Sequence, residues 1–222
     1  MTYDILRPFG PQIYKSNLDS KFVSFMKGIA QNTKKKQIDV SDTLAGNIKQ
    51  QYRAVMDESE FNTFIMEIKD HIYNAVIAFE RKYGISADTY KSSEEYSFHF
   101  GPGGPWINFQ GPGEFNPIHS HDGQLSAVYY IDVPPAIAQE NNNQVSGPFS
   151  NENHRTSAGK IDFVYGTLSY TTEYTYSHQP TTGELFIFPA TLSHLVYPFK
   201  SNVERISMSF NVFDIDLSKM KI

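Results

Sequence analysis

The hydrophobic period of this chain changes near its middle, from a helical repeat to a strand repeat. Between residues 57 and 82, apolar side chains recur at steps of three and four, which predicts one long amphipathic helix. From Glu95 the period is two, because Tyr96, Phe98 and Phe100 alternate with polar residues. The first half of the chain is therefore expected to be more helical, and the second half is expected to form a β-structure.

The long helix carries recognisable end signals. Asp57, with Glu60 three residues later, resembles a capping box, and Gly84 can take the left-handed conformation just past the last turn. We interpret this helix as a scaffold packed on the outer face of a sheet, so His71, which lies on it, is expected to be structural. A shorter helix is predicted for residues 19–31.

Short strands separated by turn signals fill the second half. The chain has 17 Phe and 14 Tyr against a single Trp, and side chains of this kind favour strands. A short edge strand, interrupted by prolines, is also predicted within residues 3–15. The other predicted strands are residues 96–100, 106–109, 124–133, 161–164, 168–176, 184–188, 195–198 and 205–212, and their spacing is typical of a β-sandwich or barrel.

Residues 136–160 interrupt this pattern with a long polar segment rich in Asn, Ser and Gly. The segment is too long for a simple hairpin connection, so we expect a mobile surface insertion, with a lid over a nearby pocket as the alternative. His154 belongs to it and is expected at the surface, and His99 is expected on the polar face of its strand.

Length and charge limit the possible partners. A chain of 222 residues is expected to form one domain, 1–222, with residues 1–94 as a helical support and 95–222 as the β-core. The net charge is −5, and the only basic cluster, residues 34–36, is expected to be a solvated loop, so we expect no nucleic-acid partner.

The N-terminus has no basic stretch followed by an apolar core, and no window approaches the about 18 apolar residues of a membrane span. We therefore expect a soluble, cytoplasmic protein without a membrane partner, and its oligomeric state stays open. With no Cys in the chain, any metal ion has to be held by His, Asp or Glu.

Two histidines lie two residues apart, between a Gly-Pro-Gly turn and a strongly β-forming run. In an extended strand such residues share a face, so His119 and His121 can converge on one ion. His194, which follows an apolar run, can supply a third imidazole. Asp122 is the alternative to His121, but in a regular strand it would point away, and Asp122-Gly123 looks like the start of a turn.

Together these features resemble the Fe(II)- and 2-oxoglutarate-dependent oxygenases, most closely the prolyl-hydroxylase-like branch and a set of oxygenases with His-x-His in place of His-x-Asp. The resemblance spans residues 106–214. It is carried by the pair His119 and His121, the strand Val128-Tyr129-Tyr130-Ile131, the turn Gly183-Glu184-Leu185, His194, and Arg205 with Ser207.

The resemblance implies a double-stranded β-helix, a cupin-like jelly roll, with the N-terminal helices on one side. It also implies Fe(II) as the metal and 2-oxoglutarate and O₂ as cosubstrates of a dioxygenase that hydroxylates a C–H bond. The guanidinium of Arg205 matches a carboxylate in two places, and Ser207 and Tyr130 are expected to bond the same carboxylate. Asn108 is expected to bond either the cosubstrate or the substrate.

Two other functions are compatible with these residues. One is a cupin-like metal enzyme that uses the three histidines without 2-oxoglutarate, although Arg205 and Ser207 argue against it. The other is a non-enzymatic jelly-roll binding protein. The substrate stays open between a peptidyl, in particular prolyl, side chain and a small molecule.

Overall fold

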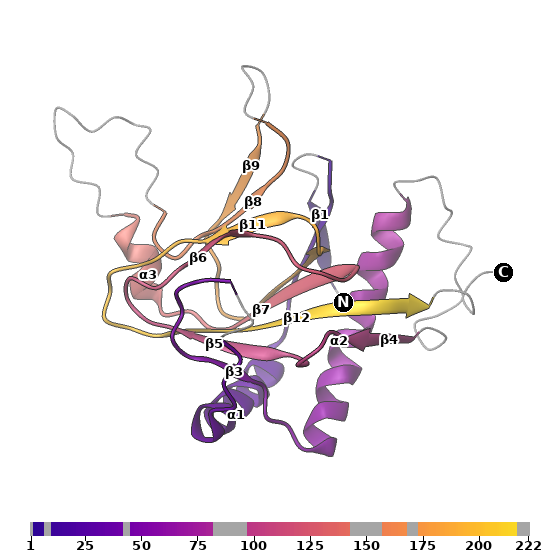
Figure 1. Cartoon of the computed structure of the whole chain (residues 1–222), viewed down its shortest axis with the longest axis horizontal. Helices are drawn as coiled ribbons and strands as arrows, with labels where there is room; N and C mark the ends of the chain where they lie inside the picture. The colour runs from indigo at the N-terminus through magenta and orange to yellow at the C-terminus, as the bar shows by residue number, and fades with distance from the viewer. Residues whose placement is uncertain are drawn as a thin grey trace.

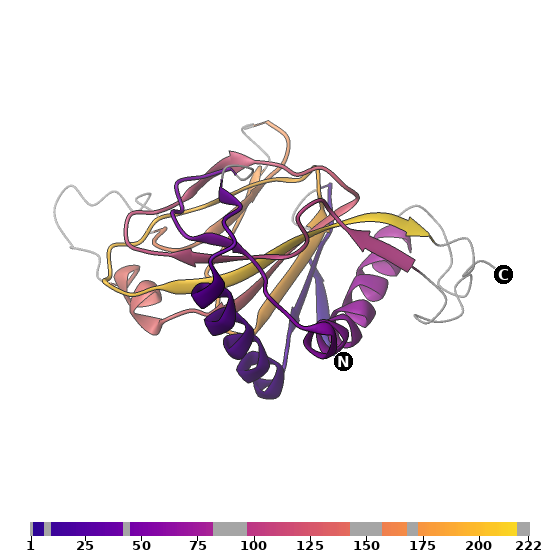
Figure 2. The same ribbon diagram turned by 60° about the horizontal axis from the view of Figure 1, so that its bottom comes forward.

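Two antiparallel sheets face each other, and two long helices cover the outer side of the larger sheet (Figure 1, Figure 2). The computed structural model describes residues 2–6, 10–41, 45–81, 97–142, 157–167 and 173–216. Gly84, Tyr96, His154 and residues 168–172, on which some of the sequence expectations rest, lie outside these ranges.

The larger sheet has eight strands. Its order is β1 (Tyr3–Leu6), β2 (Ile13–Asn17), β10 (Glu184–Pro189), β7 (Leu125–Asp132), β12 (Arg205–Asp216), β5 (Trp106–Gln110) and β3 (Gln51–Arg53), and β4 (Ser97–Phe100) also pairs with β12. The smaller sheet has the order β6 (Asn116–His119), β11 (Ser193–Val196), β8 (Ile161–Val164) and β9 (Thr175–His178). Two facing sheets of this kind form the predicted double-stranded β-helix.

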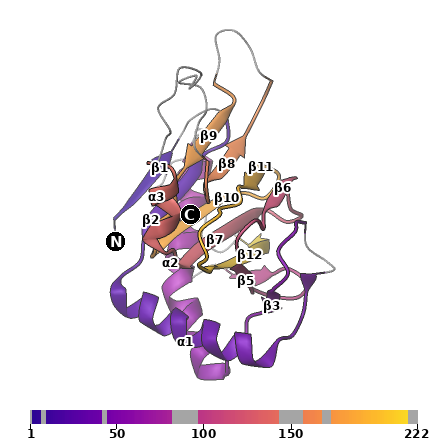
Figure 3. The same ribbon diagram turned by 90° about the vertical axis from the view of Figure 1, so that its left-hand side faces the viewer.

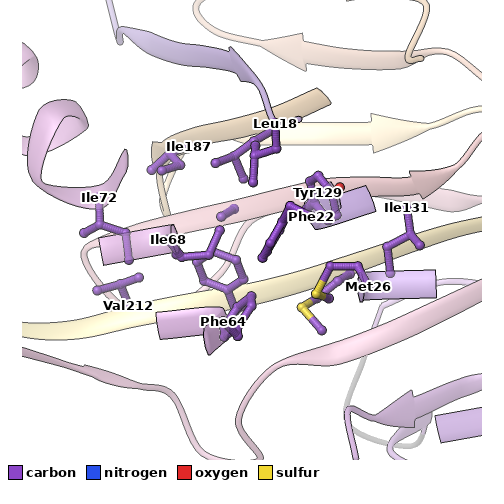
Figure 4. Close-up of a cluster of buried hydrophobic side chains, with 14 of the residues drawn as sticks. Leu18, Phe22, Met26, Phe64, Ile68, Ile72, Tyr129, Ile131, Ile187 and Val212 are labelled. Atoms are coloured by element: carbon purple, nitrogen blue, oxygen red, sulfur yellow. The ribbon is translucent and has the colours of Figure 1, made fainter. Parts of the chain in front are cut away.

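Helices α1 (Ser20–Lys36) and α2 (Glu58–Arg81) lie against one face of the larger sheet, and the smaller sheet lies over the other face (Figure 3). Strand alternation divides the apolar side chains between these two layers. Leu185 and Ile187 of β10 join the helix layer, whereas Phe186 and Phe188 point between the sheets. Figure 4 shows the helix layer, in which Phe22, Met26, Phe64 and Ile68 from the helices meet Tyr129, Ile131, Ile187 and Val212 from the sheet.

The start of α2 confirms the predicted capping box. The Asp57 backbone N–H donates to Glu60 Oε2 at 2.8 Å, and the Glu60 N–H donates to Asp57 Oδ1 at 2.8 Å. His71 on this helix is buried, and its Nδ1 lies 2.7 Å from the Tyr14 hydroxyl, which fits a structural role.

Helix α1 is longer than predicted, because it continues to Lys36. The expectation of a solvated loop at residues 34–36 is therefore wrong. The three lysines form the last helical turn, where cations interact favourably with the helix dipole. Lys34 also reaches Glu204 at 2.5 Å, and this contact between residues 170 positions apart supports the last helical turn from outside the helix.

The N-terminal segment supplies more strand than predicted. Strand β1 is the expected edge strand, but β2 lies inside the sheet between β1 and β10. Strand β3 forms at the opposite edge from a stretch without a clear hydrophobic pattern. Ladder hydrogen bonds to β5 decide its conformation, and such pairing is invisible to a local period.

The polar segment 136–160 is in part structured. Helix α3 (Pro135–Glu140) follows β7. The side-chain amide of Asn141 then forms two hydrogen bonds with the Ala158 backbone: its Nδ2 donates to the Ala158 carbonyl at 3.0 Å, and its Oδ1 accepts from the Ala158 N–H at 2.9 Å. Residues 143–156, the centre of the predicted insertion, lie outside the described ranges. None of the described helices combines the length and the apolar character that a bilayer crossing demands.

Candidate metal centre

The smaller sheet brings two histidines face to face. Strands β6 and β11 pair in antiparallel register, with His119 directly opposite His194. The ring centroids of these two residues are 4.3 Å apart, and the His121 ring lies 4.9 Å from His119 and 5.1 Å from His194. One nitrogen from each of the three rings lies within 4.8 Å of the others, which suits three ligands of one ion.

His121 reaches this cluster from a turn. Strand β6 ends at His119, and the His121 backbone N–H donates to the Ala190 carbonyl at 2.9 Å. The assumption of a regular strand through His121 is therefore wrong, although the rings converge. Gly123, with φ of 104°, helps the chain to reverse here. Asp122 is exposed and takes no part in the ligand-sized cluster found among the described residues.

Backbone carbonyls fix the orientation of two rings. His119 Nδ1 lies 2.7 Å from the Pro117 oxygen, and His194 Nδ1 lies 3.0 Å from the Leu192 oxygen. A carbonyl oxygen only accepts, so each Nδ1 carries the proton, and Nε2 is left with a free lone pair. This is the tautomer that a metal-binding imidazole needs when it binds through Nε2.

Burial keeps the three imidazoles neutral. Burial, together with a smaller effect of the neighbouring His119, lowers the pKa of His121 to about 4 and the pKa of His194 to about 3. The pKa of His119 itself is lowered by burial, against the effect of its bond to Pro117. Neutral imidazole is the form that ligates metals, so the site does not have to lose protons before it binds an ion near pH 7.

The predicted cosubstrate residues line one cavity together with the histidines. Asn108 lies opposite Ser207 in the β5–β12 pair, and Ser207 lies opposite Tyr130 in the β12–β7 pair. These side chains form one row across the inner face of the larger sheet. The row, Arg205 and the three histidines all border the cavity between the two sheets.

Arg205 is a buried cation, and no acidic residue in the described part of the chain pairs with it. Its side chain donates to the Gly159 carbonyl at 2.6 Å and to Gln110 Oε1, and its Nε has no partner. None of the ion pairs among the described residues includes it. Burial lowers the pKa of Arg205, although an arginine still keeps its proton.

Tyr130 is the second buried group with an unused polar atom. Its ring lies 5.6 Å from the Arg205 guanidinium carbon, and its hydroxyl has no hydrogen-bond partner among the residues that the structure describes. Burial raises the pKa of Tyr130, so the hydroxyl keeps its proton and can donate. A buried cation and a buried free donor at one cavity wall fit an anionic ligand such as a carboxylate.

Several residues around the cavity were not predicted. Gln110 holds Arg205, and the alternation that places Asn108 on the inner face places Gln110 there too, so a signal existed for it. The Trp106 ring lies 6.1 Å from the His121 ring. Gln51 on β3 also lines the cavity, and nothing in the sequence around it indicated a site.

The sequence of the chain was compared with known protein families and with curated proteins. Residues 104–211 match the family described as "Putative 2OG-Fe(II) oxygenase". No curated protein matches the chain.

Solved structures share the fold at low sequence identity. A prolyl-4-hydroxylase from Pseudomonas putida has a TM-score of 0.56 at 12% identity, covering 90% of this chain and 91% of that one. The alpha-ketoglutarate-dependent carbocyclase SnoK of nogalamycin biosynthesis has a TM-score of 0.55 at 11% identity, covering 91% and 79%. A prolyl hydroxylase from Trichoplax adhaerens, solved with a peptide of the hypoxia inducible factor, has a TM-score of 0.51 at 13% identity, covering 91% and 83%.

The predictions of the family, of an enzyme, and of Fe(II) with 2-oxoglutarate are confirmed by the family match and the shared fold, and the histidine cluster fits the metal. Residues 104–211, close to half of the chain, therefore carry the match to the Fe(II)- and 2-oxoglutarate-dependent oxygenases, and the chain shares its fold with solved prolyl hydroxylases.

Proposed function

We propose that His119, His121 and His194 hold the Fe(II), and that the enzyme hydroxylates an uncharged C–H-bearing group, with a peptidyl, in particular prolyl, side chain as its substrate class. Arg205, Ser207 and Tyr130 bind the distal carboxylate of 2-oxoglutarate. The observation that carries this proposal is the buried Arg205, which borders the histidine cavity and has no acidic partner in the described part of the chain.

The geometry of Arg205 suits a fixed carboxylate. Arginine has five N–H donors, and the two bonds to Gly159 and Gln110 hold the guanidinium plane while other donors stay available. The hydroxyls of Ser207 and Tyr130 come from the two neighbouring strands of the same sheet. A carboxylate bound there would be oriented before reaction, and a pre-organised site loses little entropy on binding.

The histidine side of the cavity orients the metal. Bound Fe(II) supplies O₂ activation coupled to the decarboxylation of 2-oxoglutarate to succinate and CO₂. The protein contributes neutral imidazoles whose Nδ1 protons are held by the Pro117 and Leu192 carbonyls. Apolar side chains, including Ile161, Phe188 and Val196, line the remaining wall and limit the access of water.

The charge of the cavity supports an uncharged substrate group. With its histidines neutral, Arg205 is the one charged side chain among the described residues that line the cavity. A bound 2-oxoglutarate would engage that guanidinium and leave no charged side chain of the cavity lining for the substrate. Support for a peptidyl group comes from the shared fold with the Pseudomonas putida prolyl-4-hydroxylase.

Replacing Arg205 with alanine tests the cosubstrate assignment. We expect Arg205→Ala to bind 2-oxoglutarate more weakly by roughly 2–5 kcal/mol, because removing one partner leaves a desolvated carboxylate unpaired. Isothermal titration calorimetry of the Fe(II)-loaded protein under anoxia measures this change, and succinate formation should fall in parallel. Iron stoichiometry should stay at the wild-type value.

Arg53→Ala is the matched control, because Arg53 is exposed on β3. It should leave 2-oxoglutarate affinity unchanged. Wild-type affinity in Arg205→Ala would remove the assignment of Arg205 to the cosubstrate. No binding of 2-oxoglutarate by the wild type would favour a metal enzyme that does not use it.

A further inference from the structure

One buried side chain outside the family match touches the proposed cosubstrate site. Gln51 lies on β3, whereas the match begins at residue 104. It is 2% exposed and borders the cavity. Its backbone is held from two sides, because Gln51 pairs with Asn108 in the sheet and its carbonyl accepts from the Val40 N–H at 3.0 Å.

Gln51 contacts the oxygen end of the Asn108 side-chain amide. Gln51 Nε2 donates to Asn108 Oδ1 at 2.9 Å, in a buried bond. This bond uses the acceptor of Asn108 and leaves its Nδ2 donors for other partners. The nearest protein partner recorded for Nδ2 is the Ser209 hydroxyl at 3.4 Å, a long contact that leaves donor capacity unused.

The position of Asn108 points to an anion as the ligand of this donor. On β5, Asn108 and Gln110 lie opposite Ser207 and Arg205 of β12. Paired residues lie about 4.5–5.5 Å apart between Cα atoms, and same-face neighbours on one strand lie about 6.6–6.8 Å apart. An oxygen of a carboxylate held by Arg205 and Ser207 therefore lies within reach of the Asn108 amide.

We propose that Gln51 is a positioning residue for 2-oxoglutarate: its hydrogen bond to Asn108 turns the Asn108 N–H donors toward the cosubstrate. This inference rests on the proposed role of Arg205 and Ser207. An Asn amide is nearly symmetric in shape, so sterics alone do not choose between its two orientations. Without Gln51 the oxygen can face the ligand, and an oxygen facing a carboxylate repels it.

Two substitutions of Gln51 distinguish the effect of its hydrogen bond from the effect of its side-chain volume. In Gln51→Met the side chain keeps a similar length and cannot donate, so the Asn108 amide loses its preferred orientation. In Gln51→Glu the carboxylate accepts from Asn108 Nδ2 and turns Oδ1 toward the cavity. We expect 2-oxoglutarate affinity to fall roughly 10-fold in Gln51→Met and roughly 100-fold in Gln51→Glu, the range for a hydrogen bond to a charged group.

Calorimetric titration of 2-oxoglutarate into the Fe(II)-loaded protein under anoxia measures these affinities. Gln50→Glu is the matched control, because it adds the same charge at the residue just before β3, which does not line the cavity, and it should change the affinity less than twofold. Iron stoichiometry and thermal unfolding of each variant report whether the fold and the metal site persist.

A double-mutant cycle tests whether Gln51 acts through Asn108. In an Asn108→Leu background, Gln51→Met should have no further effect on 2-oxoglutarate affinity, because the amide that it orients is absent. Additive losses in the double variant, or wild-type affinity in both Gln51 variants, would overturn the inference. A loss of iron in the Gln51 variants would also overturn it, since Gln51 would then act on the metal site.

Arg205→Ala, measured in parallel, separates this inference from the function on which it rests. Weak binding in Arg205→Ala with normal binding in the Gln51 variants rejects the role of Gln51 alone. Wild-type binding in Arg205→Ala rejects the proposed cosubstrate site, and the role of Gln51 with it.

Discussion

His121 and Asp122 are adjacent residues with opposite surroundings. The His121 ring lies beside His119, His194 and Trp106, whereas Asp122 is exposed. A carboxylate at this position would give the metal one negative ligand, and an imidazole gives it none. In the proposed centre, the turn after β6 would therefore give the metal three neutral ligands.

The contrast between these neighbours gives a prediction at the residue scale. His121→Ala should lose most of its Fe(II) affinity, because it removes a direct ligand. Asp122→Ala should keep the ion, and its Fe(II) affinity should fall by at most about 10–100-fold, which is the usual effect of a residue that contacts the ligands but not the metal. Fe(II) titration of both variants under anoxia measures the difference. The reverse order of affinities would point to a site of two histidines and one carboxylate.

At the scale of elements, Glu184 of β10 connects the two sheets. It pairs with Lys15 of β2 at 2.8 Å and with His178 of β9 at 2.8 Å, and it accepts from the Thr181 N–H. Burial by itself would raise the pKa of Glu184. The hydrogen bonds from His178, Lys15 and Thr181 outweigh that effect and lower the pKa to about 2.

This depressed pKa predicts a pH-dependent contribution to stability. Because the pKa in the folded state lies below the ordinary 4.5, the charged cluster contributes fully above about pH 4.5, and the contribution is lost as the pH falls towards 2. Glu184→Gln should lower the free energy of unfolding by about 2–3 kcal/mol at pH 7. The difference from wild type should shrink as the pH falls below 4.5.

Urea unfolding between pH 3 and pH 7 measures this difference. Glu204→Gln serves as the control, because Glu204 pairs with Lys34 at the surface, where both side chains are at least 34% exposed. It should cost no more than about 1 kcal/mol at any pH. A pH-independent cost in Glu184→Gln would mean that packing, and not charge, holds this cluster.

How much of the chain could be predicted from its sequence depends on how local the signal is. The α2 stripe and its capping box depend on neighbours within a few residues, and they were predicted closely. Strands β8 and β10 were also found, because alternation and turn residues mark them. Strand β3 was missed, because only its pairing with β5 makes it a strand.

The candidate site shows the same division. The three histidines, Arg205, Ser207, Tyr130 and Asn108 were named from spacing, alternation and family resemblance, and they border one cavity. Their roles as ligands stay predictions. Gln51 could not have been found, because its contact with Asn108 joins residues 57 positions apart. The turn at His121 could not be predicted from the sequence either, because a turn and a strand can both present residues i and i+2 to one ion.

At the scale of the whole molecule, the cavity divides its functions between the sheets. The histidines come from β6, from the turn after it and from β11 in the smaller sheet, whereas Arg205, Ser207 and Tyr130 come from the larger sheet. A cosubstrate that contacts both the metal and Arg205 would therefore join the two sheets. Such a ligand binds the folded state and finds no equivalent site in the unfolded chain.

Ligand binding should therefore raise the unfolding temperature in two separable steps. A ligand present at about 100 times its Kd adds about 2.7 kcal/mol, which for a chain of this size corresponds to a rise of about 5–10 °C. Under anoxia, Fe(II) should raise the Tm of the wild type, and 2-oxoglutarate should raise it further. Arg205→Ala should keep the rise caused by iron and lose the second, whereas His194→Ala should lose the rise caused by iron. If 2-oxoglutarate still raises the Tm of Arg205→Ala, the binding of the cosubstrate does not depend on the buried arginine of the larger sheet.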